Sequence, residues 1–130
     1  MLDTNIASYI IKKKPPTVRD RLVAIPAANV SVSVMTRAEL QYGLKRLPAE
    51  HRLHLAVAQF LKIVRVLPWD ADAADWYAQI RHQLTASGRP IGELDMMIAA
   101  HALSAGAVLV SNNIAHFDRI KAPLILENWV

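Results

Sequence analysis

Hydrophobic residues follow two different periodicities along this chain. Between residues 71 and 87 they recur every three or four positions, the spacing of one face of a helix, until Gly88 interrupts the pattern. The residues of this face are Ala73, Trp76, Tyr77, Ile80 and Leu84. Residues 107–110 instead form a continuous apolar run, which is typical of a short strand buried on both faces.

The two patterns alternate over the whole length. We predict helices over 4–11, 18–23, 36–46, 49–61, 71–87 and 93–105. We predict strands at residue 2 and over 29–34, 63–67, 107–110 and 124–126. Such alternation favours an α/β fold, a three-layer α/β/α sandwich around a central parallel sheet of about four to five strands. No repeat, low-complexity tract or linker interrupts the chain, so we expect a single domain over residues 1–130.

The first predicted strand is unusually short. Only Met1 and Leu2 precede Asp3, so we expect a few apolar residues to be missing before it, which would weaken the central strand. Thr4 or Asn5 can cap the helix that follows.

The composition excludes several kinds of chemistry. The sequence has no cysteine, which rules out a disulfide framework, a thiolate zinc site and a cysteine nucleophile. No apolar run reaches the roughly 18 residues of a spanning helix, and an acid stands at position 3, where a secretory signal is basic. We therefore expect a cytoplasmic protein with no membrane partner. The net charge of +4 favours a polyanionic partner, although ordinary soluble surfaces carry such a charge too.

Three carboxylates stand beside apolar residues instead of in acidic surface runs: Asp3, Glu39 and Asp95. Asp3 ends the first strand, while Glu39 and Asp95 are expected in the first turns of helices that begin near the same sheet edge. Ligands gather at the carboxyl ends of parallel strands, so we expect the three acids to converge on one cleft. Buried acids that lie close together must be paired, protonated or metal-bound. A divalent cation resolves that conflict.

A polar segment, Ser111-Asn112-Asn113, directly follows the apolar strand and is expected at the same edge. Mg²⁺ prefers oxygen ligands and is usually held by one or two carboxylates plus substrate phosphate. The acids therefore predict a Mg²⁺ site, with Asn113 as a weaker ligand. Such a cation activates water and neutralises the charge that builds on a phosphodiester during hydrolysis.

Each of these residues also has a simpler explanation. Asp3 could be an acid near a helix N-cap, and Asp95 could complement a helix dipole. Glu39 could be a solvated helix residue. Asn112 and Asn113 could form a turn after the strand.

The histidines do not have the spacing of a zinc site. They are His51, His54, His82, His101 and His116. The first two lie three positions apart on a helix expected to be exposed, and the others are scattered. His116 nevertheless follows Asn113 closely and could touch the substrate. No nucleophile-elbow serine or glycine-rich phosphate loop is present, so acyl transfer and nucleotide-cofactor chemistry lack support.

Two cations are close in sequence to the proposed ligands. Arg37 and Arg89 could hold the phosphates of a nucleic-acid backbone. Aromatic residues are few, so a folded RNA read through its shape and phosphates fits better than stacking along a single strand. The predicted substrate-binding residues are Arg89, Arg37, Asn112, Asn113, Ser111, Thr4 and His116.

Four segments together carry a family resemblance. They are Leu2-Asp3-Thr4-Asn5, Thr36-Arg37-Ala38-Glu39-Leu40 followed by Gly43, Gly92-Glu93-Leu94-Asp95-Met96-Met97-Ile98-Ala99-Ala100-His101-Ala102, and Val110-Ser111-Asn112-Asn113 with Phe117. In order and spacing they resemble a PIN domain, specifically the VapC toxins of bacterial type II toxin-antitoxin pairs. The similarity spans nearly the whole chain, down to Glu127-Asn128-Trp129.

The resemblance implies a Mg²⁺- or Mn²⁺-dependent endoribonuclease whose metal-binding acids are Asp3, Glu39 and Asp95. It also implies a VapB-like antitoxin whose tail covers the active cleft, a homodimeric toxin, and a larger complex that contacts operator DNA only through the antitoxin. Many relatives cut tRNA or a ribosomal RNA loop. The group with a segment like Ile11-Lys12-Lys13-Lys14-Pro15 points to tRNA, with the initiator tRNA as one candidate.

One departure from the family pattern bears on the chemistry. Many PIN domains have a fourth acid at the position of Asn113. Part of the VapC group resembles this chain in having asparagine there. A neutral ligand holds a second metal less firmly, so we expect one stable metal. The departure also leaves open a catalytically silent module that binds RNA or the antitoxin. A structure-specific DNA nuclease with the same acids is a third alternative.

Overall fold

Five parallel segments form a sheet at the centre of the molecule. In the computed structural model, which describes residues 1–130, β1 (Ser31–Ser33) pairs with β2 (Arg65–Leu67), and β3 (Leu109–Val110) pairs with β4 (Leu126–Glu127). Leu2 lies between the two pairs and forms parallel bridges to Val32 of β1 and Val110 of β3. The order across the sheet is therefore β2, β1, Leu2, β3, β4.

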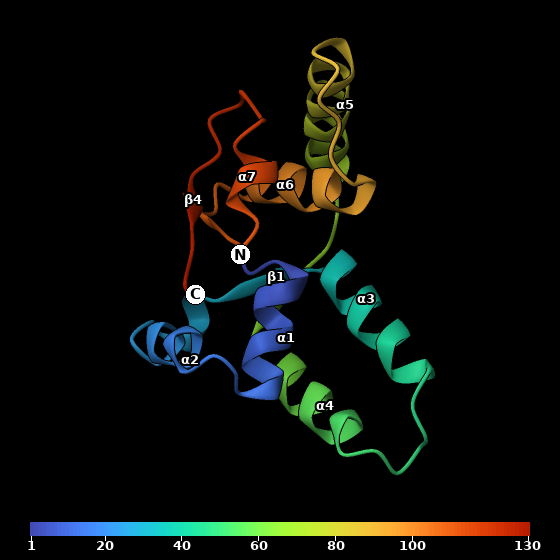
Figure 1. Cartoon of the computed structure of the whole chain (residues 1–130), viewed down its shortest axis with the longest axis vertical. Helices are drawn as coiled ribbons and strands as arrows, with labels where there is room; N and C mark the ends of the chain where they lie inside the picture. Colours follow the sequence, from blue (N-terminus) through green and yellow to red (C-terminus); the bar gives the residue numbers. More distant parts are fainter.

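Helices cover both faces of this sheet. They are α1 (Thr4–Lys12), α2 (Pro16–Val23), the 3₁₀ turn η1 (Ala27–Asn29), α3 (Val34–Lys45), α4 (Leu53–Ile63), α5 (Ala71–Ala86), α6 (Glu93–Ala105) and α7 (Ile114–Phe117). Figure 1 shows α1 to α4 on one side of the sheet and α5 to α7 on the other. The predicted α/β sandwich with a parallel sheet is confirmed. None of these helices has both the length and the apolar content needed to cross a membrane.

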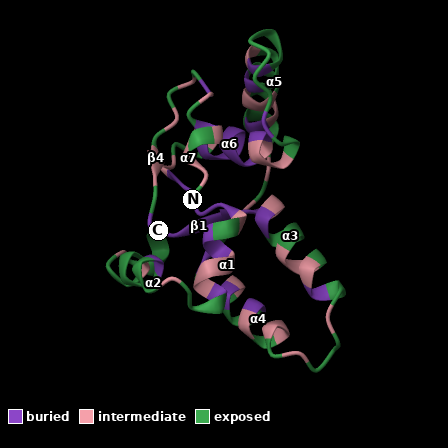
Figure 2. Cartoon of the chain, viewed as in Figure 1, coloured by how far each residue is buried: buried purple, intermediate pink, exposed green.

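The hydrophobic core has two parts, one on each face of the sheet. Leu2 and Val110 belong to the cluster packed under α1 and α4, whereas Met1 and Leu109 belong to the cluster packed under α5 and α6. Successive residues of a strand point to opposite faces, so these two-residue segments supply both clusters. Figure 2 shows the buried residues concentrated along the sheet and on α6. Residues 107–110 are continuously apolar because both faces of this strand are covered.

Several predicted boundaries are wrong, and side-chain caps explain two of them. Residues 29–34 were expected as one strand, but the Ser33 hydroxyl accepts a hydrogen bond from the Met35 amide (3.0 Å), so helix α3 begins at Val34. Asp3, not Thr4 or Asn5, caps α1. The helix expected over 49–61 begins only at Leu53, after a turn, and ends at Ile63.

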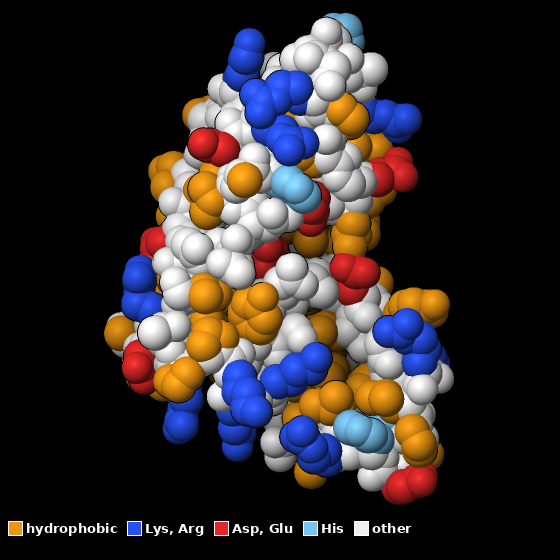
Figure 3. Space-filling view, in the orientation of Figure 1, with side chains coloured by type: hydrophobic (Ala, Val, Ile, Leu, Met, Phe, Trp, Pro, Cys, Tyr) orange, Lys and Arg blue, Asp and Glu red, His pale blue; other side chains and the backbone are white.

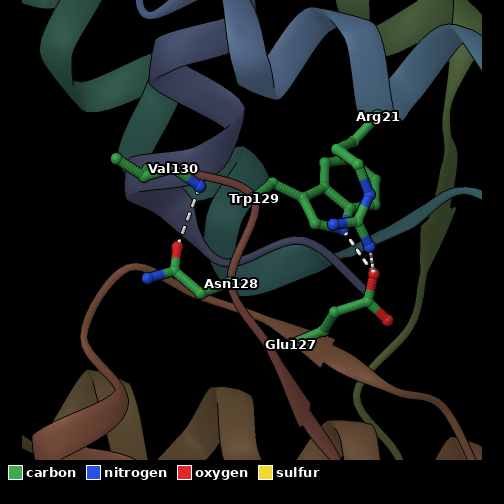
Figure 4. A network of polar contacts seen from close by, with 5 residues as sticks. All are labelled: Arg21, Glu127, Asn128, Trp129 and Val130. Atoms are coloured by element: carbon green, nitrogen blue, oxygen red, sulfur yellow. Dashed lines mark hydrogen bonds and ion pairs between the residues drawn. The ribbon is translucent and has the colours of Figure 1, made fainter.

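The last residues of the chain contact α2 through Arg21. Arg21 of α2 forms an ion pair with Glu127, and its guanidinium lies 5.9 Å from the centre of the Trp129 ring. Trp129 Nε1 donates to the same carboxylate at 2.8 Å. Figure 4 shows Glu127 between these two partners, with Asn128 turned toward the Val130 amide. The predicted strand over 124–126 is displaced to Leu126–Glu127.

Candidate active site

Asp3 is held firmly at the end of the central strand. Its amide donates to the Val110 carbonyl of β3 (3.0 Å), and its Oδ1 accepts from the Ile6 amide (2.9 Å). The Ser111 hydroxyl and the Asn5 amide also donate to the carboxylate. Burial, with only 4% of the residue exposed, raises the pKa of Asp3 despite these donors, and the charge of Asp95 adds to the rise.

Asp95 faces Asp3 from the first turn of α6. Burial is again the main reason that its pKa is raised, although one third of its side chain is still exposed (33%). His116 opposes the rise, since its Nδ1 lies 3.9 Å from Asp95 Oδ2. The two acids are thus both desolvated, and no lysine or arginine forms an ion pair with either of them.

The strand order explains why Asp3 and Ser111 meet. The chain leaves the central segment through α1 toward β1 on one side, and leaves β3 through α7 toward β4 on the other. Connections that diverge from neighbouring parallel strands open a crevice at their carboxyl ends. Asp3 and Ser111 stand at these two ends, so the topology brings together residues from opposite parts of the sequence.

The loop after β3 supports both acids. Ser111 is fully buried and, besides donating to Asp3, accepts from the Asn113 amide at 2.8 Å. The Asn113 side-chain amide lies 2.7 Å from His116 Nδ1, within hydrogen-bond distance. Asn112 points elsewhere, because its Oδ1 accepts from Asn128 Nδ2 at 3.2 Å. Of the predicted loop residues, the structure therefore places Ser111, Asn113 and His116 beside the two acids.

Glu39 lies at the side of this centre, not inside it. It is exposed in the second turn of α3, one turn later than expected, because α3 begins at Val34. With Thr4 it lines an open groove of about 330 Å³ between α1, α3 and α4. Thr4 Oγ1 lies 3.2 Å from the hydroxyl of buried Thr36, which ties the starts of α1 and α3 together. Glu39 as a metal ligand remains a prediction.

The two candidate phosphate-binding cations are on the surface. Arg37 on α3 and Arg89 in the loop before α6 are exposed and form no ion pair. Figure 3 shows acidic side chains in the hollow between the upper and lower parts of the molecule, with lysine and arginine side chains toward both ends. This distribution fits a nucleic-acid backbone that is held by cations at both ends and passes over the acids between them.

The donor set of the centre suits a hard divalent cation. Asp3 and Asp95 supply carboxylate oxygens and Asn113 can supply an amide oxygen, which are the ligand types that Mg²⁺ prefers. A cation would remove the repulsion between two desolvated carboxylates that no lysine or arginine neutralises. No group of three or more histidine, aspartate or glutamate side chains is close enough to enclose an ion. The site therefore resembles an open Mg²⁺ site, whose remaining ligands are water or substrate.

We expect Mg²⁺ to raise the melting temperature of the protein more at pH 8 than at pH 4. Both carboxyl pKa values are raised above 3.8 in the folded state, so the folded protein binds more protons than the unfolded chain just above that pH. As the pH rises through this window, the contribution of these groups to the stability of the metal-free protein falls. At pH 8 protons also no longer compete with the cation for the two carboxylates.

Differential scanning fluorimetry with and without Mg²⁺ measures this effect. The shift should be much smaller in Asp95→Asn. An equal shift in the variant and the parent at pH 8 would show that the cation binds elsewhere.

Two structural contacts near the acids were missed from the sequence. Thr36 was noted only as part of a motif, and His101 only as one of the scattered histidines, yet both are buried. His101 Nδ1 lies 2.7 Å from the Ser33 hydroxyl. The available signal was a polar residue inside an apolar helical run, since Ala100 and Ala102 flank His101.

Comparison with known protein families identifies the class of fold. The PIN domain family matches residues 1–123. The fold and the acidic centre therefore define a PIN domain.

Individual relatives narrow this class. The chain is 40% identical over 129 residues to the tRNA(fMet)-specific endonuclease VapC of Shigella flexneri, covering 99% of this chain and 96% of that protein. It is also 40% identical over 130 residues to ribonuclease VapC2 of Haemophilus influenzae, covering 100% of this chain and 97% of the relative. The chain belongs to the VapC family of PIN-domain ribonucleases, which confirms the resemblance seen in the sequence motifs.

Solved structures give the same result. VapBC of Salmonella typhimurium bound to DNA contains a chain that superposes with a TM-score of 0.92 at 38% identity, covering 100% of this chain and 97% of that one. VapBC2 of Rickettsia felis, bound to a DNA fragment from its promoter, contains a chain with a TM-score of 0.91 at 36% identity, covering 100% and 98%.

Proposed function

We propose that this chain is the toxin of a type II toxin-antitoxin pair, a divalent-metal-dependent endoribonuclease that cleaves tRNA and so inhibits translation and growth. One observation carries the proposal: Asp3 and Asp95 meet at the switch point of the sheet, both desolvated and neither paired with a lysine or an arginine. In this proposal the whole chain forms one domain and acts in the cytoplasm, where tRNA is found.

The residues of the centre would hold Mg²⁺ between Asp3 and Asp95, with Glu39 and Asn113 as weaker candidates and Mn²⁺ as a substitute. When bound, such a cation would lower the pKa of a water molecule and neutralise charge on the scissile phosphodiester. Ser111 and the first amides of α1 orient the Asp3 carboxylate, which leaves it little freedom to turn away. His116 and Asn113, hydrogen-bonded to each other, border the Asp95 carboxylate and can contact the phosphate.

Charge and composition support RNA as the substrate. Arg37 and Arg89 are exposed cations without ion-pair partners, and are available for backbone phosphates. The relative from Shigella flexneri is named for cleavage of the initiator tRNA, which makes tRNA the first substrate to test. The +4 net charge favours association with such a polyanion.

The groove beside Glu39 supports an antitoxin partner. It joins the polar residues Thr4 and Glu39 to an apolar floor made by α1, α3 and α4. We propose that a segment of a VapB-like antitoxin lies in this groove and blocks access to the acids. The solved VapBC complexes bound to DNA support a VapB-like partner. In this proposal a toxin homodimer contacts operator DNA only through the antitoxin.

The test is cleavage of total tRNA by the purified, antitoxin-free protein, with Mg²⁺, with Mn²⁺ and with excess chelator. We expect discrete fragments that require the metal and do not appear with Asp95→Asn. Matched RNA and DNA hairpins run beside the tRNA distinguish a ribonuclease from a DNA nuclease. No fragments from folded protein, on tRNA or ribosomal RNA, would favour a catalytically silent binding module.

A further inference from the structure

A buried hydrogen-bonded pair joins the two halves of the molecule outside the acidic centre. His101 of α6 is 2% exposed and Ser33, at the end of β1, is 0% exposed. His101 Nδ1 lies 2.7 Å from Ser33 Oγ. This contact is a polar connection between α6 and the start of α3, beside the apolar packing of Met35 against the cluster under α5 and α6.

The remaining contacts of the pair fix where its protons lie. Ser33 Oγ already accepts from the Met35 amide at 3.0 Å, so its single proton is free to be donated to His101 Nδ1. The other ring nitrogen then carries the proton and faces the Pro68 carbonyl, in the loop before α5. Burial lowers the pKa of His101, which agrees with a neutral ring, although the charge of Asp70 opposes this effect. The ring thus connects three segments: the start of α3, the loop after β2, and α6.

These segments carry the acids of the proposed site. Glu39 follows Ser33 on α3, and Asp95 precedes His101 on α6, each within two helical turns. A buried polar pair with every donor and acceptor satisfied allows only one relative position of the elements it joins, because any sliding leaves an unpaired polar group. A purely apolar contact between α3 and α6 would permit small displacements.

We propose that His101 is a positioning residue that fixes the Asp95-bearing helix α6 against the end of β1, next to the central strand that ends in Asp3, so that Asp95 and Asp3 serve one divalent cation. The proposal rests on the proposed function, in which that cation supports RNA cleavage. His101 does not touch the acids; it acts through Ser33 and through the backbone of α6.

The test compares two replacements of His101 by their affinity for Mn²⁺, measured by electron paramagnetic resonance in the absence of RNA. His101→Asn places an amide oxygen near the position of Nδ1 and retains an acceptor for Ser33, whereas His101→Leu has similar bulk but no acceptor. We expect Mn²⁺ binding about tenfold or more weaker in His101→Leu, as for other residues that orient metal ligands, and within about threefold of the parent in His101→Asn.

Ser104→Ala is the matched control. Ser104 lies one turn further along α6 and donates only to the His101 carbonyl of the same helix, so its loss should leave Mn²⁺ affinity unchanged. Circular dichroism and melting temperature identify the folded fraction of each variant. If folded His101→Leu binds Mn²⁺ as tightly as the parent, or if both replacements weaken binding equally, the proposal is wrong.

The two levels of the proposal fail in different ways. If the parent itself binds no Mn²⁺, the metal-dependent function is wrong. If the parent binds Mn²⁺ and only the His101 variants behave unexpectedly, the function stands and the positioning role does not. Should His101→Leu fail to fold, His101→Asn combined with Ser33→Ala supplies the comparison, since removing the donor should then weaken Mn²⁺ binding about tenfold.

Discussion

Replacing Asp95 by asparagine is expected to reduce metal-dependent RNA cleavage by about 10³-fold or more, because stabilisation by a bound cation amounts to several kcal/mol. Asparagine has nearly the same shape but no charge, so it removes half of the carboxylate pair that Asp3 and Asp95 form. The fold should survive, since the relief of a desolvated charge offsets the lost interaction with the α6 dipole. Single-turnover cleavage of tRNA at saturating Mg²⁺ measures the loss.

Glu93→Gln is the matched control for this experiment. Glu93 lies in the same first turn of α6, but its carboxylate is 63% exposed and faces α5. It accepts from Tyr77 Oη at 2.8 Å and lies 3.7 Å from Arg81. We expect cleavage within about threefold of the parent, since an exposed pair contributes little. Comparable losses in both variants would assign the effect to the helix terminus instead of to Asp95.

Replacing Leu2 by alanine is expected to lower the free energy of unfolding by about 3 kcal/mol or more. Leu2 is 1% exposed, and it is the residue that bridges β1 on one side and β3 on the other. The truncation leaves a cavity at the place where the two halves of the sheet meet. A domain of this size has only about 5–15 kcal/mol of stability in total, so the loss is a large fraction. The midpoint of urea unfolding measures it.

Leu55→Ala controls for the loss of a leucine side chain as such. Leu55 is on α4 and is 65% exposed, so its truncation should change stability by no more than about 0.5 kcal/mol. If Leu2→Ala proved as mild as Leu55→Ala, the bridges of Leu2 would not be what holds the sheet together.

The fold class followed from local patterns that the structure confirms. The apolar face of α5 and the buried run before Ser111 each depend on neighbouring residues only, and such periodicities persist in the folded chain. Helix starts were harder to predict, because a serine such as Ser33 can continue a strand or cap a helix. Whether such a serine continues the strand or caps the helix depends on tertiary contacts, which the local pattern does not contain.

The acidic centre could be predicted in part. Asp3 and Asp95 were expected at the same sheet edge, and the structure places them within electrostatic reach of each other. The Ser111–Asp3 contact and the buried Ser33–His101 contact join residues far apart in sequence and depend on the strand order. Periodicity does not encode that order, so these contacts became visible only in the folded chain.

The position of Asp3 beside Ser111 has a consequence for how the protein is made. Asp3 is synthesised near the start of the chain, but Val110, which accepts from its amide, and Ser111, which contacts its carboxylate, are synthesised near the end. Contacts between such distant residues form late in folding. A growing or truncated chain that ends before β3 lacks the residues that hold Asp3 opposite Asp95, even if its first helices have folded. We therefore expect the nascent polypeptide to lack an assembled acidic centre until nearly all of the chain has been synthesised.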